Sequence, residues 1–167
     1  MRTLPVHHPI SPVTESDLHA FAHLVPPSGI HLLVLLGKPA GLRLINGLAG
    51  VQVLVPKGPC NNPGGARVWA YLAGVIGIEA MHKLAAEMGG ECLEVPTLDA
   101  LRKERRNRAI RAEFDRLTAR APAGEGLSKA RAVQELGLMH APITWRQLET
   151  ILDRPSLEPV CQNNLFE

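Results

Sequence analysis

Apolar and polar positions recur with the same spacing in two stretches of the chain, forty residues apart. GKPAGLRLINGLAGVQVLVP covers residues 37–56, the first copy, and GIEAMHKLAAEMGGECLEVP covers residues 77–96, the second copy. The two align without a gap, and six aligned positions are identical: Gly37/Gly77, Ala40/Ala80, Leu44/Leu84, Gly50/Gly90, Val55/Val95 and Pro56/Pro96. Each copy predicts a helix, a glycine turn, a short strand and a proline stop.

The first copy shows both periodicities clearly. Leu42, Ile45 and Leu48 fall on one face of a helix. Gly50 suits the left-handed position that ends a helix. The alternating residues 51–55 then predict a strand.

The second copy predicts a helix over residues 78–88 and a strand over residues 92–95. A single short strand cannot form a sheet alone. The two strands therefore pair either with each other inside one chain or with the same strands of a partner chain. The apolar run 30–36, just before the first copy, is compatible with a strand or a helix, because its periodicity does not decide.

Three helices are predicted after the second copy. LRKERRNRAIRAEFDRLTAR contains no Gly or Pro, and its apolar stripe has the spacing i, i+4, i+7 at Ile110, Phe114 and Leu117. Two shorter helices are predicted at 129–136 and 143–152, with Gly137 closing the first of them. This is the layout of a helix-turn-helix unit.

The pattern as a whole predicts a mainly α fold with a small β-sheet (α+β). We expect four parts: an N-terminal arm with a short helix (1–29), a duplicated helix-turn-strand assembly domain (30–98), a basic helix with a helix-turn-helix-like unit (99–154) and a C-terminal tail (155–167).

The composition says more about the cellular compartment of the protein than about its function. Aromatic residues are only 4% of the chain, so aliphatic side chains must fill the core. Three widely spaced cysteines favour a reduced environment over a disulfide framework. We found no signal-peptide pattern or apolar run of membrane-spanning length, and we expect a cytoplasmic protein without membrane contact.

The positive charge is concentrated in one window. Residues 101–120 hold eight Arg and Lys against three Asp and Glu, whereas the net charge of the chain is only +2. Such a cluster binds phosphate by releasing condensed counterions, and the bidentate arginine fork favours that contact. The alternative is a solvated helix face. The candidate DNA-phosphate residues are Arg102, Lys103, Arg105, Arg106, Arg108 and Arg111.

The last predicted helix supplies candidates for DNA-base or groove contact. In a helix-turn-helix unit this helix faces base edges or the flanking phosphates. Its first residues are Thr144, Trp145, Arg146 and Gln147. Three-helix units also serve as protein-binding modules, so the layout alone leaves both classes open.

The stretch from the second copy into the basic helix resembles the Mor transcription activator family of Mu-like bacteriophages. The resemblance covers about residues 75–152 and rests on Gly89-Gly90, Val95-Pro96, Arg106-Asn107, Ile110 and Phe114-Asp115. It implies a dimerising helix-and-strand portion and a helix-turn-helix that binds an imperfectly symmetric promoter and recruits RNA polymerase. The protein would then be a non-enzymatic phage or prophage regulator that binds double-stranded DNA as a homodimer.

The chain departs from this family in two ways. Its turn 137–143 is longer and contains Pro142, and its last helix offsets Arg146 and Arg154 with Glu149 and Asp153. The first copy is also an addition, which makes an intrachain substitute for the dimer core conceivable. The alternative function is a phage protein-interaction or assembly module that has lost promoter recognition.

No pattern predicts a metal, a cofactor or catalysis. Among seven histidines only His19 and His23 stand at i, i+4, and no cysteine pair is close enough to complete a site. The glycine-rich segment 57–65 lacks the ending of a phosphate loop and reads as a turn between the copies. No nucleophile or acid–base arrangement stands out, and we expect no enzyme activity.

Overall fold

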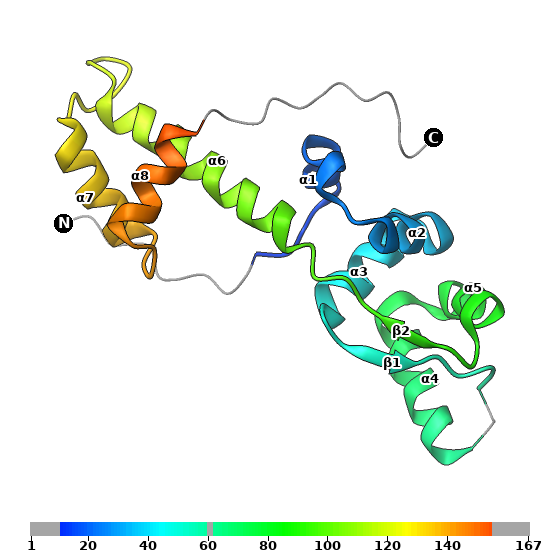
Figure 1. Cartoon of the computed structure of the whole chain (residues 1–167). Helices are drawn as coiled ribbons and strands as arrows, with labels where there is room; N and C mark the ends of the chain where they lie inside the picture. The colour runs from blue at the N-terminus through cyan, green and yellow to red at the C-terminus, as the bar shows by residue number, and fades with distance from the viewer. Residues whose placement is uncertain (1–10, 60–61, 155–167) are drawn as a thin grey trace. The chain divides into compact units, whose positions relative to one another are not determined.

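The computed structural model describes residues 11–59 and 62–154 (Figure 1). Its helices are α1 (Glu15–Ala20), η1, a 3₁₀ turn (Ala22–Leu24), α2 (Pro27–Leu36), α3 (Lys38–Leu48), α4 (Pro63–Ile76), α5 (Ile78–Met88), α6 (Asp99–Thr118), α7 (Lys129–Met139) and α8 (Trp145–Asp153). The strands are β1 (Gln52–Leu54) and β2 (Cys92–Glu94), and they form one antiparallel sheet. The predicted fold class, mainly α with a small sheet, is confirmed. The described residues divide into two compact units, residues 12–101 and residues 102–154, the second of which also includes Ser11.

The two sequence copies have matching backbones. Helices α3 and α5 each begin after a glycine in the left-handed region, with φ of 81° at Gly37 and 93° at Gly77. The glycines that follow them, Gly50 and Gly90, have φ of 74° and 91°. Only glycine adopts such angles readily, which explains why these positions keep the same residue in both copies.

The strands of the two copies pair with each other inside the chain. Gln52 lies opposite Glu94, Val53 opposite Leu93 and Leu54 opposite Cys92. The sequence leaves open whether these strands pair within one chain or with a partner chain. In the structure they pair within one chain (Figure 1).

The copies extend further upstream than their sequence similarity. The undecided run 30–36 belongs to helix α2, and α2 and α4 both end directly before the matched glycines. Leu32 of α2 and Leu72 of α4, forty residues apart, are each 1% exposed. Helix α4 begins at Pro63, earlier than the predicted turn 57–65 allows, because the Asn62 side chain accepts a 2.6 Å hydrogen bond from the Gly65 amide and caps the helix.

The segment before α2 belongs to the core of residues 12–101 as far as the structure describes it. We expected residues 1–29 to form an arm with a short helix, but Val13, Leu18, Phe21 and Val25 are buried with the residues of the two copies. Burial of these apolar side chains stabilises the segment in the core, despite the prolines in it. Residues 1–10 and the predicted tail 155–167 lie outside the described residues.

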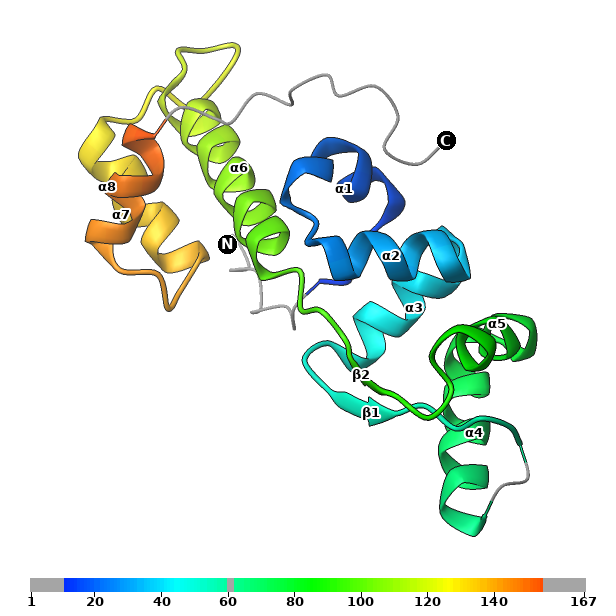
Figure 2. The ribbon, with the colours of Figure 1, turned by 45° about the vertical axis from the view of Figure 1, so that its right-hand side comes forward.

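The 102–154 unit consists of most of α6 with α7 and α8 (Figure 2). Its small core is formed by Ile110, Leu117, Ala132, Val133, Leu136, Leu148 and Ile151. The prediction that Gly137 closes its helix is wrong, because α7 continues to Met139 and the His140 amide still donates to the Leu136 carbonyl. Within the residues described, we found no helix that has both the length and the apolar character to cross a membrane.

Candidate functional site

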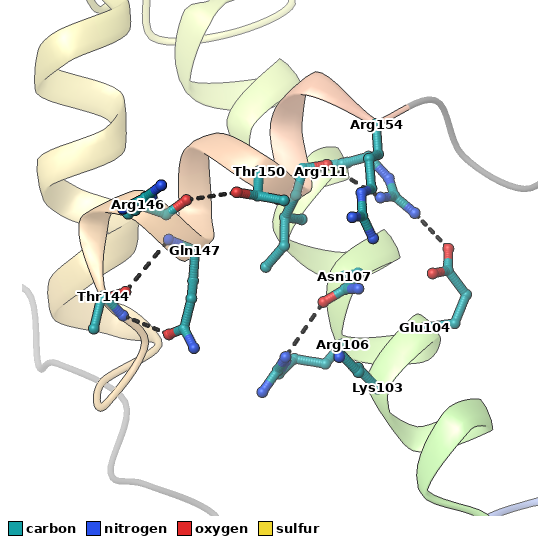
Figure 3. Close-up of a pocket in the computed structure, with 11 residues that line it drawn as sticks. Lys103, Glu104, Arg106, Asn107, Arg111, Thr144, Arg146, Gln147, Thr150 and Arg154 are labelled. Carbon is teal, nitrogen blue, oxygen red and sulfur yellow. Dashed lines mark hydrogen bonds and ion pairs between the residues drawn. The ribbon is translucent and has the colours of Figure 1, made fainter.

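A groove of about 600 Å³ lies between α6 and α8 within the 102–154 unit (Figure 3). Most of the residues that line it are of polar or charged type. One side is formed by α6 residues, namely Lys103, Glu104, Arg106, Asn107 and Arg111. The other side is formed by the start and the exposed face of α8 with its flanking residues, namely Thr144, Arg146, Gln147, Thr150, Ile151 and Arg154.

The groove brings together candidates from both sequence-predicted sets. Lys103, Arg106 and Arg111 represent the DNA-phosphate set, and Thr144, Arg146 and Gln147 the base or groove set. The two sets are more than thirty residues apart in sequence. Their convergence follows from the packing of α8 against α6, since Ile110 and Ile151 lie in one core.

The other candidates lie outside this lining. They are Arg102, Arg105, Arg108 and Trp145. Arg105 donates a 2.7 Å hydrogen bond to the Ser11 carbonyl. The indole nitrogen of Trp145 donates to Glu149 Oε1 at 3.0 Å. Both side chains therefore have partners within the chain.

Helix α8 carries two exposed strips of opposite character. Arg146, Thr150 and Arg154, at i, i+4 and i+8, line the groove. Trp145, Glu149 and Asp153 have the same spacing one residue earlier, and none of the three lines the groove. The near-neutral composition of this helix in the sequence thus averages a basic strip and an acidic strip.

Arg111 serves the architecture of the groove. Its guanidinium group forms an ion pair with Glu104, and the two side chains are only 15% and 12% exposed. Arg111 also donates a 3.2 Å hydrogen bond to the Ile151 carbonyl of α8. The hydrogen bond to Ile151 links α6 to α8. The ion pair, whose partners both belong to α6, neutralises the one carboxylate of the groove lining, so the remaining charge of the lining is positive.

The start of α8 is fixed by a capping box. Thr144 Oγ1 accepts a hydrogen bond from the Gln147 amide at 3.3 Å, and Gln147 Oε1 accepts one from the Thr144 amide at 2.9 Å (Figure 3). The cap uses the oxygen of the Gln147 side chain and does not require its amide nitrogen, which lies at the groove. Thr144 and Gln147 thus have a structural role in addition to the predicted contact role.

His140, in the turn between α7 and α8, is electrostatically linked to this region. Burial lowers the pKa of His140, and the charge of Arg106 acts in the same direction, while Glu113 opposes them. His140 is therefore neutral at pH 7 and adds no charge beside the groove.

Five lining residues were not among the predicted site residues: Glu104, Asn107, Thr150, Ile151 and Arg154. Thr150 and Arg154 could have been found, because they follow Arg146 at helical spacing. Asn107 is one of the residues on which the resemblance to the Mor family rests, but its place in the groove depends on which face of α6 packs against α8. That packing is a tertiary property.

Within the described part of the chain, the structure shows no cluster of three or more His, Cys, Asp or Glu side chains that could hold a metal ion. Scans against protein-family models, curated proteins and solved structures gave no match to this chain.

Proposed function

We propose that the 102–154 unit binds double-stranded DNA and that the protein is a DNA-binding regulator of phage or prophage type. The observation that carries this proposal is the α6–α8 groove. It presents the exposed cations Lys103, Arg106, Arg146 and Arg154 beside hydrogen-bonding amides and hydroxyls, and Arg111 neutralises its single carboxylate. Cations with neutral donors and acceptors are the chemistry that a DNA surface requires.

The arrangement suggests a division of labour between the two sides of the groove. In the proposed complex the start of α8 enters the major groove, which is wide enough for a helix. One phosphate backbone then lies along the protein groove, contacted by Lys103 and Arg106 from α6 and by Arg154 from α8. Arg146, Gln147 and Thr150 are left to contact base edges.

The regulatory role is the less direct part of the proposal. It is supported by the resemblance of residues 75–152 to the Mor family, which also suggests RNA polymerase as a partner. A bacterial two-hybrid assay of the full chain against polymerase subunits tests it. Binding to DNA without any polymerase contact would restrict the function to DNA binding alone.

A salt titration of duplex binding, read by fluorescence anisotropy, tests the DNA proposal. We expect affinity to fall steeply with salt, and the slope of log K against log salt to flatten by about 2 in the Arg106→Ala/Arg154→Ala variant, because two charges proposed to contact phosphate are lost. The matched control is Arg120→Ala/Arg131→Ala, which removes two exposed charges that do not line the groove. Equal slopes in both variants would contradict the role of the groove.

A protein-interaction module remains the second candidate, because the strip formed by Trp145, Glu149 and Asp153 includes an indole that is 49% exposed. Aromatic side chains of this kind are enriched at protein interfaces. Absence of duplex binding at low salt, with the fold intact by circular dichroism, would favour this function over DNA binding.

A further inference from the structure

We infer that the two copies form one closed, pseudo-twofold core within a single chain, so that each core carries one DNA-binding unit. The protein then binds DNA as a monomer at a single element without twofold symmetry. The DNA part of this inference depends on the function proposed above, whereas the closed core does not.

The backbone hydrogen bonds between the copies are related by the forty-residue offset. The Gly50 amide donates to the Val95 carbonyl at 2.8 Å, and the Gly90 amide donates to the Val55 carbonyl at 2.8 Å. A second pair of hydrogen bonds is related by the same offset. The Val55 amide donates to the Glu91 carbonyl at 2.9 Å, and the Val95 amide donates to the Val51 carbonyl at 3.0 Å. Each bond has its equivalent with the roles of the copies exchanged, which is the signature of a twofold relation.

The axis of this relation passes through the middle of the sheet. Val53 lies opposite Leu93, its own equivalent in the other copy. A surface pocket of about 430 Å³ also contains matched positions of both copies, including Ala40 with Ala80 and Arg43 with Lys83. Two separate regions of the unit therefore place equivalent residues together.

The core is closed because each copy covers the other. Helix α2 of the first copy contacts α5 of the second, and α4 contacts α3 in return. The strand residues Val55 and Val95 are buried to 0% and 1% exposure. A second chain is not needed to cover these apolar residues, since the two copies of one chain already cover each other.

Only the second copy leads into a DNA-binding unit. Its strand is followed by Pro96 and then by α6, which begins at Asp99. The first copy is followed by residues 57–62 and then by α4, which is the leading helix of the second copy. A symmetric dimer of helix-turn-helix units reads two half-sites about 34–36 Å apart. One unit per core reads one such element.

A cysteine crosslink tests whether the strands pair within one chain in solution. Leu54 is opposite Cys92, between the bonded positions Val53/Leu93 and Val55/Glu91, and non-bonded antiparallel neighbours are about 4.5 Å apart between Cα atoms, within disulfide range. We expect Leu54→Cys, in a Cys60→Ser/Cys161→Ser background of the full chain, to give under mild oxidation a crosslinked product of monomer mass. Leu54 is 66% exposed, so the substitution should not prevent folding.

The matched control for the crosslink is Val51→Cys in the same background, because Val51 is also exposed but lies opposite Val95 rather than Cys92. It should crosslink far less. A disulfide-linked dimer of Leu54→Cys on a non-reducing gel would overturn the closed core, since the strands would then pair between chains. No crosslink at all would also overturn it.

Selection of bound duplexes from a random library tests the DNA part with the wild-type full chain. We expect an enriched motif without dyad symmetry and a complex of one chain per duplex by light scattering. A palindromic motif occupied by two chains would overturn the inference and leave the proposed DNA binding intact. If no duplex is retained, the proposed function and the single-element inference both fail, and the crosslink alone decides the closed core.

Discussion

The two compact units of this chain are stabilised in different ways. Residues 12–101 bury a large aliphatic core, and symmetric backbone hydrogen bonds join the two copies. Residues 102–154 have a core of seven buried residues, supplemented by charged contacts such as the Arg111–Glu104 pair. The unit proposed to bind DNA is thus the one with less apolar burial.

The difference shows how one chain separates stability from binding. A groove that attracts phosphate must keep cations exposed and near one another. This leaves fewer positions for buried apolar side chains, and the like charges repel one another. The 102–154 unit therefore depends on individual polar contacts to position α8. Substitutions in the core of residues 12–101 should therefore lower the stability of that whole unit, whereas substitutions in residues 102–154 should act mainly on the contacts near the changed residue.

The largest effects are expected in the core of the two copies. Leu44→Ala and Leu84→Ala should each lower the free energy of unfolding by about 2–5 kcal/mol, because both side chains are fully buried at equivalent positions. Urea unfolding followed by circular dichroism measures both. Similar costs would support the structural equivalence of the copies, whereas a near-neutral result for one of them would break it.

The next largest effect is expected at the contact between α6 and α8. Arg111→Ala should destabilise the 102–154 unit by about 1–3 kcal/mol, because it leaves the largely buried Glu104 carboxylate unpaired and removes the bond to the Ile151 carbonyl. Hydrogen exchange should show faster opening of α8 with little change in residues 12–101. The double variant Glu104→Gln/Arg111→Ala should recover part of the loss, and equal loss in single and double variants would count against the pair.

A smaller effect is expected at the helix caps, which occur in both units. Thr14→Ala and Thr144→Ala should each cost about 1 kcal/mol, because each threonine is part of a capping box. Ser128→Ala is the matched control, since Ser128 precedes α7 but makes no side-chain cap hydrogen bond. Thermal unfolding distinguishes them, and a Ser128 cost equal to that of Thr144 would refute the assignment.

The smallest effect concerns pH. The pKa of His140 is lower in the folded protein than the usual value of about 6.5. The unfolded chain therefore binds more protons as pH falls below neutrality, and stability should decrease over that interval. His140→Gln should have a shallower loss of urea midpoint between pH 7.5 and 5.5. Because Arg106 also lowers this pKa, Arg106→Ala should raise it in an NMR titration.

Sequence periodicity predicted α3, the helices from α5 to α8 and the duplicated strands, because these depend on local pattern, but it left α2 undecided and did not predict α4. The repeat fixed the positions of α3, α5, β1 and β2 closely, and glycine at the matched turns reflects a backbone angle that few other residues adopt. A wrong prediction within these helices concerned Gly137. A glycine past an apolar run usually ends a helix, but here Leu136 and Leu148 pack together in the core and α7 continues.

The groove could be predicted only in part. The basic cluster and the first residues of α8 were visible in the sequence, but which cations share a surface depends on the packing of α8 on α6. That packing placed Arg106 and Arg146 on the groove and left Arg105 with the Ser11 carbonyl. It also revealed that the acidic residues of α8 occupy their own strip, which a composition count cannot show.

The intrachain pairing of β1 and β2 has a consequence for how the molecule can change. In a homodimer every substitution appears twice, whereas here each half can be altered alone. Trp69 of α4 packs edge-on against His82 of α5, with ring centroids 5.2 Å apart, while the equivalent positions in the first copy hold Gly29 and Leu42. One half thus has an aromatic contact that the other lacks, and a substitution in one half leaves the other half unchanged.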